Sequence, residues 1–246
     1  MPNANILVSP CYETFLYKIM TIENLLKSVD ESYLHFNRVD SYLDYNDGEQ
    51  PPRDRTQNSQ QCFEKSPNTS WEDHCDKARS RTYACCFSLE NSTFIWANYG
   101  GGNPEKQVCL VFHYGKLRQY LNEALNGGRL FQGDTECHQI FDINYGKVAY
   151  IDWQEHFEGK ELLPNAIQYS FLKDNEYSDE NELRISLSFA GGGQFHDFSF
   201  EKSIQLGFNF KEAFQQKIIS GIEVDREKID PDFLARLRER GFNPAE

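Results

Sequence analysis

The sequence predicts a single α+β domain over residues 1–246, built on a mixed or largely antiparallel sheet with flanking helices. Strand-like and helix-like segments follow one another without the regular strand–helix–strand order of a parallel α/β fold, and no internal repeat is present. Hydrophobic residues make up 39% of the chain and aromatic residues 14%, which is enough for one large core. The polar segment 44–71 is the exception, and we expect a long loop or lid within this domain.

The first part of the chain predicts two strands around one helix. Residues 16–20 have the pattern of a short strand, and Thr21 can cap a helix through 24–27 whose apolar positions share one side. The alternating residues 32–37 predict a second strand. After the polar segment, residues 72–81 have helical composition.

The middle of the chain predicts three strands and an amphipathic helix. Residues 82–88 and 108–113 predict strands, and the second of these is apolar enough for burial on both faces. Residues 116–126 predict the helix, and Gly127 follows at a position suited to a left-handed C-cap. Residues 147–151 predict a further strand.

The clearest alternation lies in residues 182–189. The odd-numbered residues are apolar and share one face, whereas the even-numbered residues, Glu182 to Ser188, share the other. If the extended backbone starts two residues earlier, Glu180 joins the polar face. A last helix is expected to start at Asp230-Pro231 and to end at Gly241.

The net charge and the cysteine pattern limit the partners and the cellular compartment that we expect for the protein. The chain has 25 Lys and Arg against 38 Asp and Glu, a net charge of −13, which argues against a broad basic surface for nucleic acid or an anionic bilayer. No apolar run approaches the roughly 18 residues of a membrane span, and no secretory signal pattern is present. The seven irregularly spaced cysteines are typical of reduced thiols. We therefore expect a cytoplasmic protein without a membrane partner.

Short motifs follow one another along most of the chain: Leu-Tyr-Lys-Ile at 16–19, Tyr-Asn-Asp-Gly-Glu at 45–49, Cys-Phe-Ser at 86–88, Ile-Trp-Ala-Asn-Tyr at 95–99, Lys173 ahead of Glu-Asn-Glu-Leu-Arg at 180–184, and Ile-Ile-Ser-Gly-Ile at 218–222. In this order they resemble a large, mostly bacterial family known as domain of unknown function 2971. The order is also similar, more distantly, to that of ADP-ribosyltransferases, which have a basic residue on an early strand and a late Glu-x-Glu.

The resemblance implies an ADP-ribosyltransferase-like split sheet and an NAD-consuming transferase or glycohydrolase, such as a toxin or phage-defence effector. NAD would be the substrate, and the acceptor would be an unidentified protein or nucleic acid. The implied residues are Glu182 and Glu180 as catalytic groups, and, as NAD-binding groups, Tyr17, Lys18, Ser88, Trp96, Tyr99 and Arg184. Lys18 takes the place of the Arg or His of that family.

The chemistry of NAD cleavage explains why these residue types would be sufficient for the reaction. Breaking the nicotinamide–ribose bond builds positive charge on the ribose, so a nearby carboxylate stabilises the transition state. One of the two glutamates would hold the ribose and the other would orient or deprotonate the acceptor, while Arg184 favours their charged forms. Trp96 or Tyr99 would stack on the positive nicotinamide ring, and Lys18 would reach the diphosphate.

Other interpretations stay open at the level of sequence. The polar face of 182–189 can be an ion-pair stripe on a solvated sheet, and Trp96 can be a core anchor. The whole chain can be a non-catalytic protein-binding module with an acidic, aromatic surface. No metal site is predicted by spacing, although Asp47, Glu49 and Glu180 could serve as oxygen ligands of a metal-dependent nuclease or hydrolase.

Overall fold

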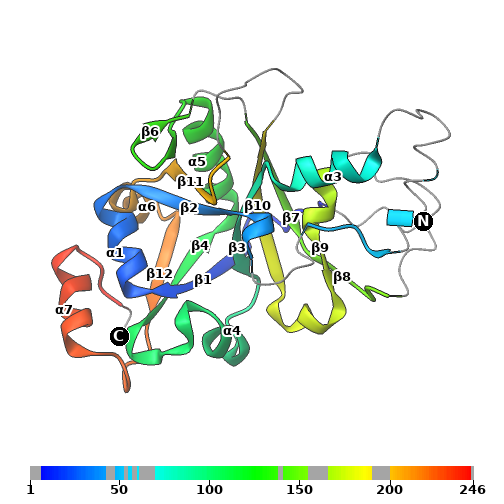
Figure 1. Cartoon of the computed structure of the whole chain (residues 1–246). Helices are drawn as coiled ribbons and strands as arrows, with labels where there is room; N and C mark the ends of the chain where they lie inside the picture. The colour runs from blue at the N-terminus through cyan, green and yellow to red at the C-terminus, as the bar shows by residue number, and fades with distance from the viewer. Residues whose placement is uncertain are drawn as a thin grey trace.

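The computed structural model describes residues 7–42, 48–52, 55–56, 60, 70–137, 141–154, 166–189 and 200–244. The polar segment 44–71 therefore lies largely outside the described residues. Within the described part, the strands form a 10-stranded sheet and a separate two-stranded sheet, with helices around them (Figure 1). Every pairing in the large sheet is antiparallel and the small sheet is parallel, which confirms the α+β class and the largely antiparallel sheet.

The large sheet contains β1 (Phe15–Thr21), β2 (Tyr33–Arg38), β3 (Thr82–Ser88), β4 (Gln107–His113), β5 (Leu130–Gln132), β6 (Thr135–Glu136), β7 (Phe141–Lys147), β10 (Glu182–Phe189), β11 (Ser203–Gly207) and β12 (Ile219–Glu223). The small sheet contains β8 (Ala149–Ile151) and β9 (Leu172–Asp174). The α-helices are α1 (Ile22–Asp30), α3 (Trp71–Arg79), α4 (Thr93–Asn98), α5 (Tyr114–Asn126), α6 (Phe210–Gln215) and α7 (Pro231–Glu239). Short 3-10 helices are η2 (Val39–Ser41), η3 (Gly100–Gly102), η4 (Pro104–Lys106), η5 (Ala166–Phe171) and η6 (Asn175–Glu180).

Most predicted elements are present, and two helix caps act as expected. The hydroxyl of Thr21 accepts a hydrogen bond from the Asn24 N–H at the start of α1. The carboxylate of Asp230 accepts one from the Asp232 N–H at the start of α7. The β4 strand is buried along its whole length, as its continuous apolar sequence predicts.

Three local predictions were wrong. The segment 147–151 is not one strand, because Val148 separates the end of β7 from β8. Gly127 has φ −80° rather than a left-handed conformation, because its N–H still donates to the Glu123 carbonyl as in a helix, and Gly128 takes the left-handed turn at φ 70°. Glu180 is not on the strand, since it ends η6 and the next residue, Asn181, is left-handed at φ 43°.

The large sheet is split beside its central strand. One edge of β3 pairs with β10 along its length. The other edge pairs with β2 at Tyr83 and Ala84 and with β1 only at Ser88. Among the described strands, none pairs with residues 85–87 on this second edge. The strands β1 and β2, which α1 connects, thus diverge at this point (Figure 1).

The two faces of β10 are both buried. Leu183, Ile185 and Leu187 are 0% exposed and belong to the main core together with residues of α5. On the opposite face Glu182, Arg184 and Ser186 are also buried. The polar face is therefore not a solvated ion-pair stripe. The alternation separates an apolar core on one face of β10 from a buried polar region on the other.

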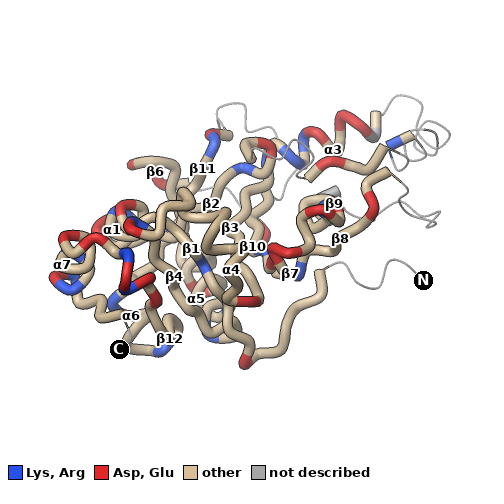
Figure 2. The backbone as a smooth tube through the Cα atoms, turned by 90° about the horizontal axis from the view of Figure 1, so that it is seen from below, with Lys and Arg blue, Asp and Glu red and all other residues tan. Residues whose placement is uncertain are grey.

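The outer helices carry charges of both signs, as Figure 2 shows for α1, α3 and α7. The first turns of α3 and α7 contain acidic residues and their last turns contain basic residues, an arrangement that the helix dipole favours. Among the described residues, every helix is too short or too polar to cross a bilayer.

We expect Ile185→Ala to destabilise the protein by about 2–5 kcal/mol, because it leaves a cavity in a fully buried position beside β3 and β7. Urea unfolding followed by circular dichroism measures this loss. Gln119→Ala, on the exposed side of α5, is the control and should change stability by less than about 0.5 kcal/mol. Equal effects of the two substitutions would contradict this placement of the core.

Candidate functional site

A cavity of about 520 Å³ lies on the polar face of the sheet, where the sheet is split. Its walls come from β1, β2, β3 and β10, from α1, and from the segments around η3, β9 and η6. Every sequence-predicted site residue except Trp96 lines it: Tyr17, Lys18, Ser88, Tyr99, Glu180, Glu182 and Arg184. The fold therefore brings together residues that are far apart in the chain.

Trp96 lies on α4 outside the lining of this cavity. Its indole Nε1 donates to the Asn91 side-chain oxygen at 2.8 Å, and its carbonyl accepts from the Gln107 side chain at 2.9 Å. Trp96 thus holds the α4 segment against β4. The aromatic residue that α4 places in the cavity lining is Tyr99, directly after the helix.

The floor of the cavity contains a buried ion pair within β10. Arg184 Nε lies 2.8 Å from Glu182 Oε1, and Arg184 Nη2 lies 3.0 Å from Oε2, so the pair is bidentate. Arg184 Nη1 also donates to the Ser170 carbonyl at 2.5 Å. The side chains are 0% and 5% exposed, and the two residues face the same side because they are two apart on a strand.

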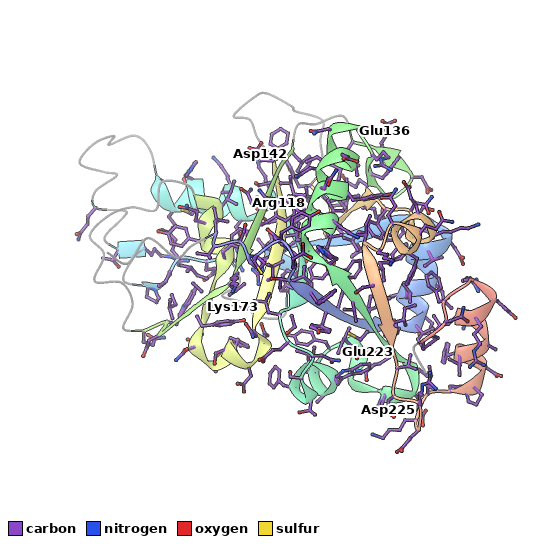
Figure 3. The ribbon with its side chains drawn as sticks, turned by 180° about the vertical axis from the view of Figure 1, so that it is seen from behind. Arg118, Glu136, Asp142, Lys173, Glu223 and Asp225 are labelled. Atoms are coloured by element: carbon purple, nitrogen blue, oxygen red, sulfur yellow. The ribbon has the colours of Figure 1, made fainter. Side chains whose placement is uncertain are left out.

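Glu180 reaches the same cluster from the η6 turn. Lys173, on β9 between η5 and η6 (Figure 3), places its Nζ 2.6 Å from Glu180 Oε2 and 3.4 Å from Glu182 Oε2. The Tyr99 hydroxyl favours the ionised form of Glu180 and so lowers the pKa of this carboxyl group. The left-handed Asn181 makes this convergence possible, because it turns the chain sharply between the two glutamates.

Further hydrogen bonds fix the backbone of the two glutamates. The Ser88 hydroxyl donates to the Glu180 carbonyl at 2.9 Å and accepts from the Glu90 N–H at 3.1 Å. The Tyr150 hydroxyl accepts from the Glu182 N–H at 2.8 Å. Ser88, expected to contact NAD, therefore also joins the end of β3 to the η6 turn.

Burial acts on both glutamates, but their pKa values shift in opposite directions. Burial raises the pKa of Glu180, and the Glu182 charge adds to this rise, while Lys173 and Tyr99 oppose it. Burial alone would also raise the pKa of Glu182, but Arg184 and Lys173 outweigh it and the pKa is lowered. Glu182 is consequently a fixed negative charge, whereas Glu180 is the carboxylate that can exchange a proton.

On the split edge of β3, side chains instead of a neighbouring strand donate hydrogen bonds to the backbone carbonyl groups. Lys18 Nζ donates to the Cys86 carbonyl at 3.0 Å and lies 5.0 Å from the centre of the Phe87 ring. The Tyr42 hydroxyl donates to the Ala84 carbonyl at 3.0 Å. These contacts keep the gap open and place a cation in it.

Sequence reasoning missed several residues of this site. Lys173 is part of one of the motifs, and its position seven residues ahead of Glu180 is the signal that points to it. Tyr42 and Tyr150 carry no such signal, because their hydrogen-bond partners, Ala84 and Glu182, come from distant parts of the chain. His35 is part of no motif, although it also lines the cavity.

The metal-site interpretation finds little support in the described residues. Glu49 is paired with Arg79 at 2.7 Å and with Arg55 at 3.6 Å, and it does not line the cavity. Asp47 lies outside the described residues. Across the described chain, no three His, Cys, Asp or Glu side chains are grouped so that they could hold a metal ion.

We expect Arg184→Met to destabilise the protein by about 3–5 kcal/mol at neutral pH, because it leaves Glu182 charged and buried. In the variant Arg184 no longer outweighs burial, so the pKa of Glu182 is raised instead of lowered. Glu182 of the folded variant therefore takes up a proton as the pH falls, and the loss of stability becomes smaller toward about pH 5. Urea unfolding at several pH values measures this. The double variant Glu182→Gln with Arg184→Met should regain part of the stability, and a pH-independent loss would contradict the assignment.

We expect Lys173→Met to raise the pKa of Glu180 further, because the ammonium group favours the ionised carboxylate. Lys173→Arg keeps the charge and should leave the pKa close to that of the wild type. Carbon-detected NMR titration of the glutamate carboxyl signals, assigned with Glu180→Gln, measures both. An unchanged pKa in Lys173→Met would show that the 2.6 Å contact does not govern Glu180.

Comparisons with known proteins add one distant structural likeness. Neither a protein-family model nor a curated protein matches the chain, so the resemblance to the domain of unknown function 2971 family stays an expectation from its motifs. Among solved structures, the chain is similar to "Thermus sp. 2.9 DarT in complex with ADP-ribosylated ssDNA", with a TM-score of 0.34 and 13% sequence identity. The match covers 96% of this chain and 95% of that chain. A likeness of this size supports no conclusion about the site.

Proposed function

We propose that this chain is an NAD-consuming enzyme, an ADP-ribosyltransferase or an NAD glycohydrolase, and that its reaction takes place in the cavity at the split of the sheet. The observation that carries the proposal is the Glu180 carboxylate. It lines a cavity of about 520 Å³, Lys173 holds it at 2.6 Å, and Lys173 and Glu182 act on its charge in opposite directions.

The charge of the cavity supports an anionic ligand. The protein carries a net charge of −13, yet the cavity is lined by the cations Lys18, Lys27, Lys173 and Arg184 and, among the described residues, by only the two glutamates as anions. A positive cavity in an acidic protein attracts a ligand such as a dinucleotide diphosphate. Lys18 and Lys27 would bind the diphosphate, since Lys173 and Arg184 are engaged with the glutamates.

The proposed reaction begins with cleavage of the bond between C1′ of the ribose and the nicotinamide nitrogen. The electron pair of this bond passes to the nicotinamide ring, which leaves as a neutral molecule, and positive charge develops on the ribose. A carboxylate beside the ribose stabilises that charge, and it does so strongly in a site shielded from water. Glu180 is the carboxylate with this position in our proposal.

The second half of the reaction needs a base. The acceptor, or water in the glycohydrolase case, attacks C1′ through an oxygen or nitrogen atom and loses a proton. Glu180, with its raised pKa, would accept this proton more readily than Glu182, whose pKa is lowered. In this proposal Glu182 stays ionised and keeps a constant negative charge in the floor of the cavity. The Tyr99 ring lies beside the positive nicotinamide ring.

The motif order extends the proposal to a biological role. Its resemblance to ADP-ribosyltransferases implies a protein or nucleic acid as acceptor and a function as a toxin or phage-defence effector. Both belong to the same proposal, and both depend on NAD cleavage.

We expect Glu180→Gln to lower the rate of nicotinamide release from NAD by about 10²- to 10⁴-fold, because it removes the negative charge and the base together. Nicotinamide release is measured by chromatography, and a transferred ADP-ribose unit by mass spectrometry of the added acceptor. Glu176→Gln, on the exposed part of the same η6 turn, is the matched control and should keep full activity. Glu182→Gln should also lose activity, together with stability.

Two outcomes would replace this function. Wild-type protein that releases no nicotinamide and adds no ADP-ribose would leave a non-catalytic binding module. Cleavage of nucleic acid that a chelator abolishes would favour the metal-dependent hydrolase instead.

A further inference from the structure

The cavity has a definite order of chemical groups along the split edge of β3. At Ser88, which pairs with Tyr17 and Glu182, lie the two glutamates. At Cys86, in the middle of the gap, lies the Lys18 ammonium group. At Ala84, which pairs with Asn37, the β2 strand begins to close the gap. Ala84 and Ser88 are four residues apart on an extended strand, so their backbones are about 13 Å apart.

The end at Ala84 presents the polar pair of His35 and Asn37 on β2. The His35 Nε2 lies 3.0 Å from the Asn37 side-chain oxygen. Because an amide oxygen only accepts hydrogen bonds, Nε2 carries the hydrogen and Nδ1 is the acceptor of the neutral ring. The Asn37 amide nitrogen supplies donors next to it, so this end offers a donor and an acceptor on neighbouring side chains.

The surroundings favour the neutral form of this histidine. Burial lowers the pKa of His35, the charges of Lys18 and Lys27 lower it further, and the hydrogen bond to Asn37 opposes them. Both lysines line the same cavity as His35. A neutral donor–acceptor pair is thus bordered on one side by positive charge.

Aromatic surface completes this end of the cavity. Tyr33 is buried beside His35, with ring centres 6.2 Å apart, and Tyr42, whose hydroxyl bonds to β3, also lines the cavity. Asn37 is exposed, so this end opens to solvent. Flat apolar surface with a neutral donor and acceptor is the chemistry that recognises a purine base.

We infer that the end of the cavity formed by Tyr33, His35 and Asn37 binds the adenine base of NAD, so that the dinucleotide lies along the split with its diphosphate at Lys18 and its nicotinamide riboside at Glu180. The inference rests on the proposed function and adds the orientation of NAD in the cavity. The adenine base would then fill this end of the cavity, and the anomeric carbon would lie at the other end, beside Glu180. The acceptor therefore has to enter beside Tyr99.

Two half-substrates test the two ends separately. Isothermal titration calorimetry measures the binding of adenosine monophosphate and of nicotinamide mononucleotide to each variant of the full chain. We expect His35→Ala and Asn37→Ala to weaken adenosine monophosphate by about tenfold, the value of one lost hydrogen bond, with nicotinamide mononucleotide unchanged. Glu180→Gln should do the reverse, because the nicotinamide ring is positive. Lys18→Met should weaken both, since each carries a phosphate.

The controls separate binding from folding. Gln119→Ala on α5 should leave both affinities unchanged, and thermal melting shows whether each variant is folded. Asn37 is exposed, so Asn37→Ala is the variant that keeps the test valid if His35→Ala unfolds.

The failure of this inference differs from the failure of the proposed function. Unchanged adenosine monophosphate affinity in folded His35→Ala and Asn37→Ala overturns the inference alone, provided that nicotinamide mononucleotide still depends on Glu180. Equal weakening of both half-substrates by Asn37→Ala also overturns it, because the ends would then not be separate. Wild-type protein that binds neither half-substrate overturns both.

Discussion

The interior of this protein depends on the ion pair between Glu182 and Arg184. A strand with alternating polar residues normally turns its polar face to water, yet Arg184 is 0% exposed. Burying an unpaired ion costs several kcal/mol, so this face can be covered only if every charge has a partner. The bidentate contact with Glu182, the Ser170 carbonyl and the nearby Lys173 provide those partners. Charged chemistry can consequently lie inside the fold and beside a cavity.

The split in the sheet poses a related problem for the backbone. A strand edge that has lost its neighbour leaves carbonyl groups that must be satisfied in the interior. Lys18 and Tyr42 satisfy two of them on β3, and both side chains also line the cavity. The gap and its polar lining therefore have one cause. Removing a strand creates the space, and the groups that replace its hydrogen bonds give the space its charge.

Periodicity predicted the parts of the fold in which local sequence and burial agree. The strands at 82–88 and 182–189 have the predicted bounds, because the first is a short apolar run and the second alternates clearly, and a turn follows or precedes each. Periodicity could not show that the polar face of 182–189 is buried, since a solvated and a covered polar face have the same pattern. It also misplaced Glu180, because the left-handed Asn181 interrupts the strand without changing the composition. Motif order predicted seven of the residues that line the cavity, whereas the roles of Tyr42 and His35 depend on contacts between distant segments.

The two glutamates show how position within one cluster divides their roles. They are two residues apart and both are buried, so burial pushes both pKa values upward. Only Glu182 has an arginine in bidentate contact, and this contact reverses the direction of its shift. Glu180 has a single lysine and a tyrosine hydroxyl, which do not reverse the rise. A pair of carboxylates with opposed shifts contains one group that stays charged and one that can take a proton. This asymmetry comes from the turn at Asn181, because a continuous strand would have placed both carboxylates on one face beside the same arginine.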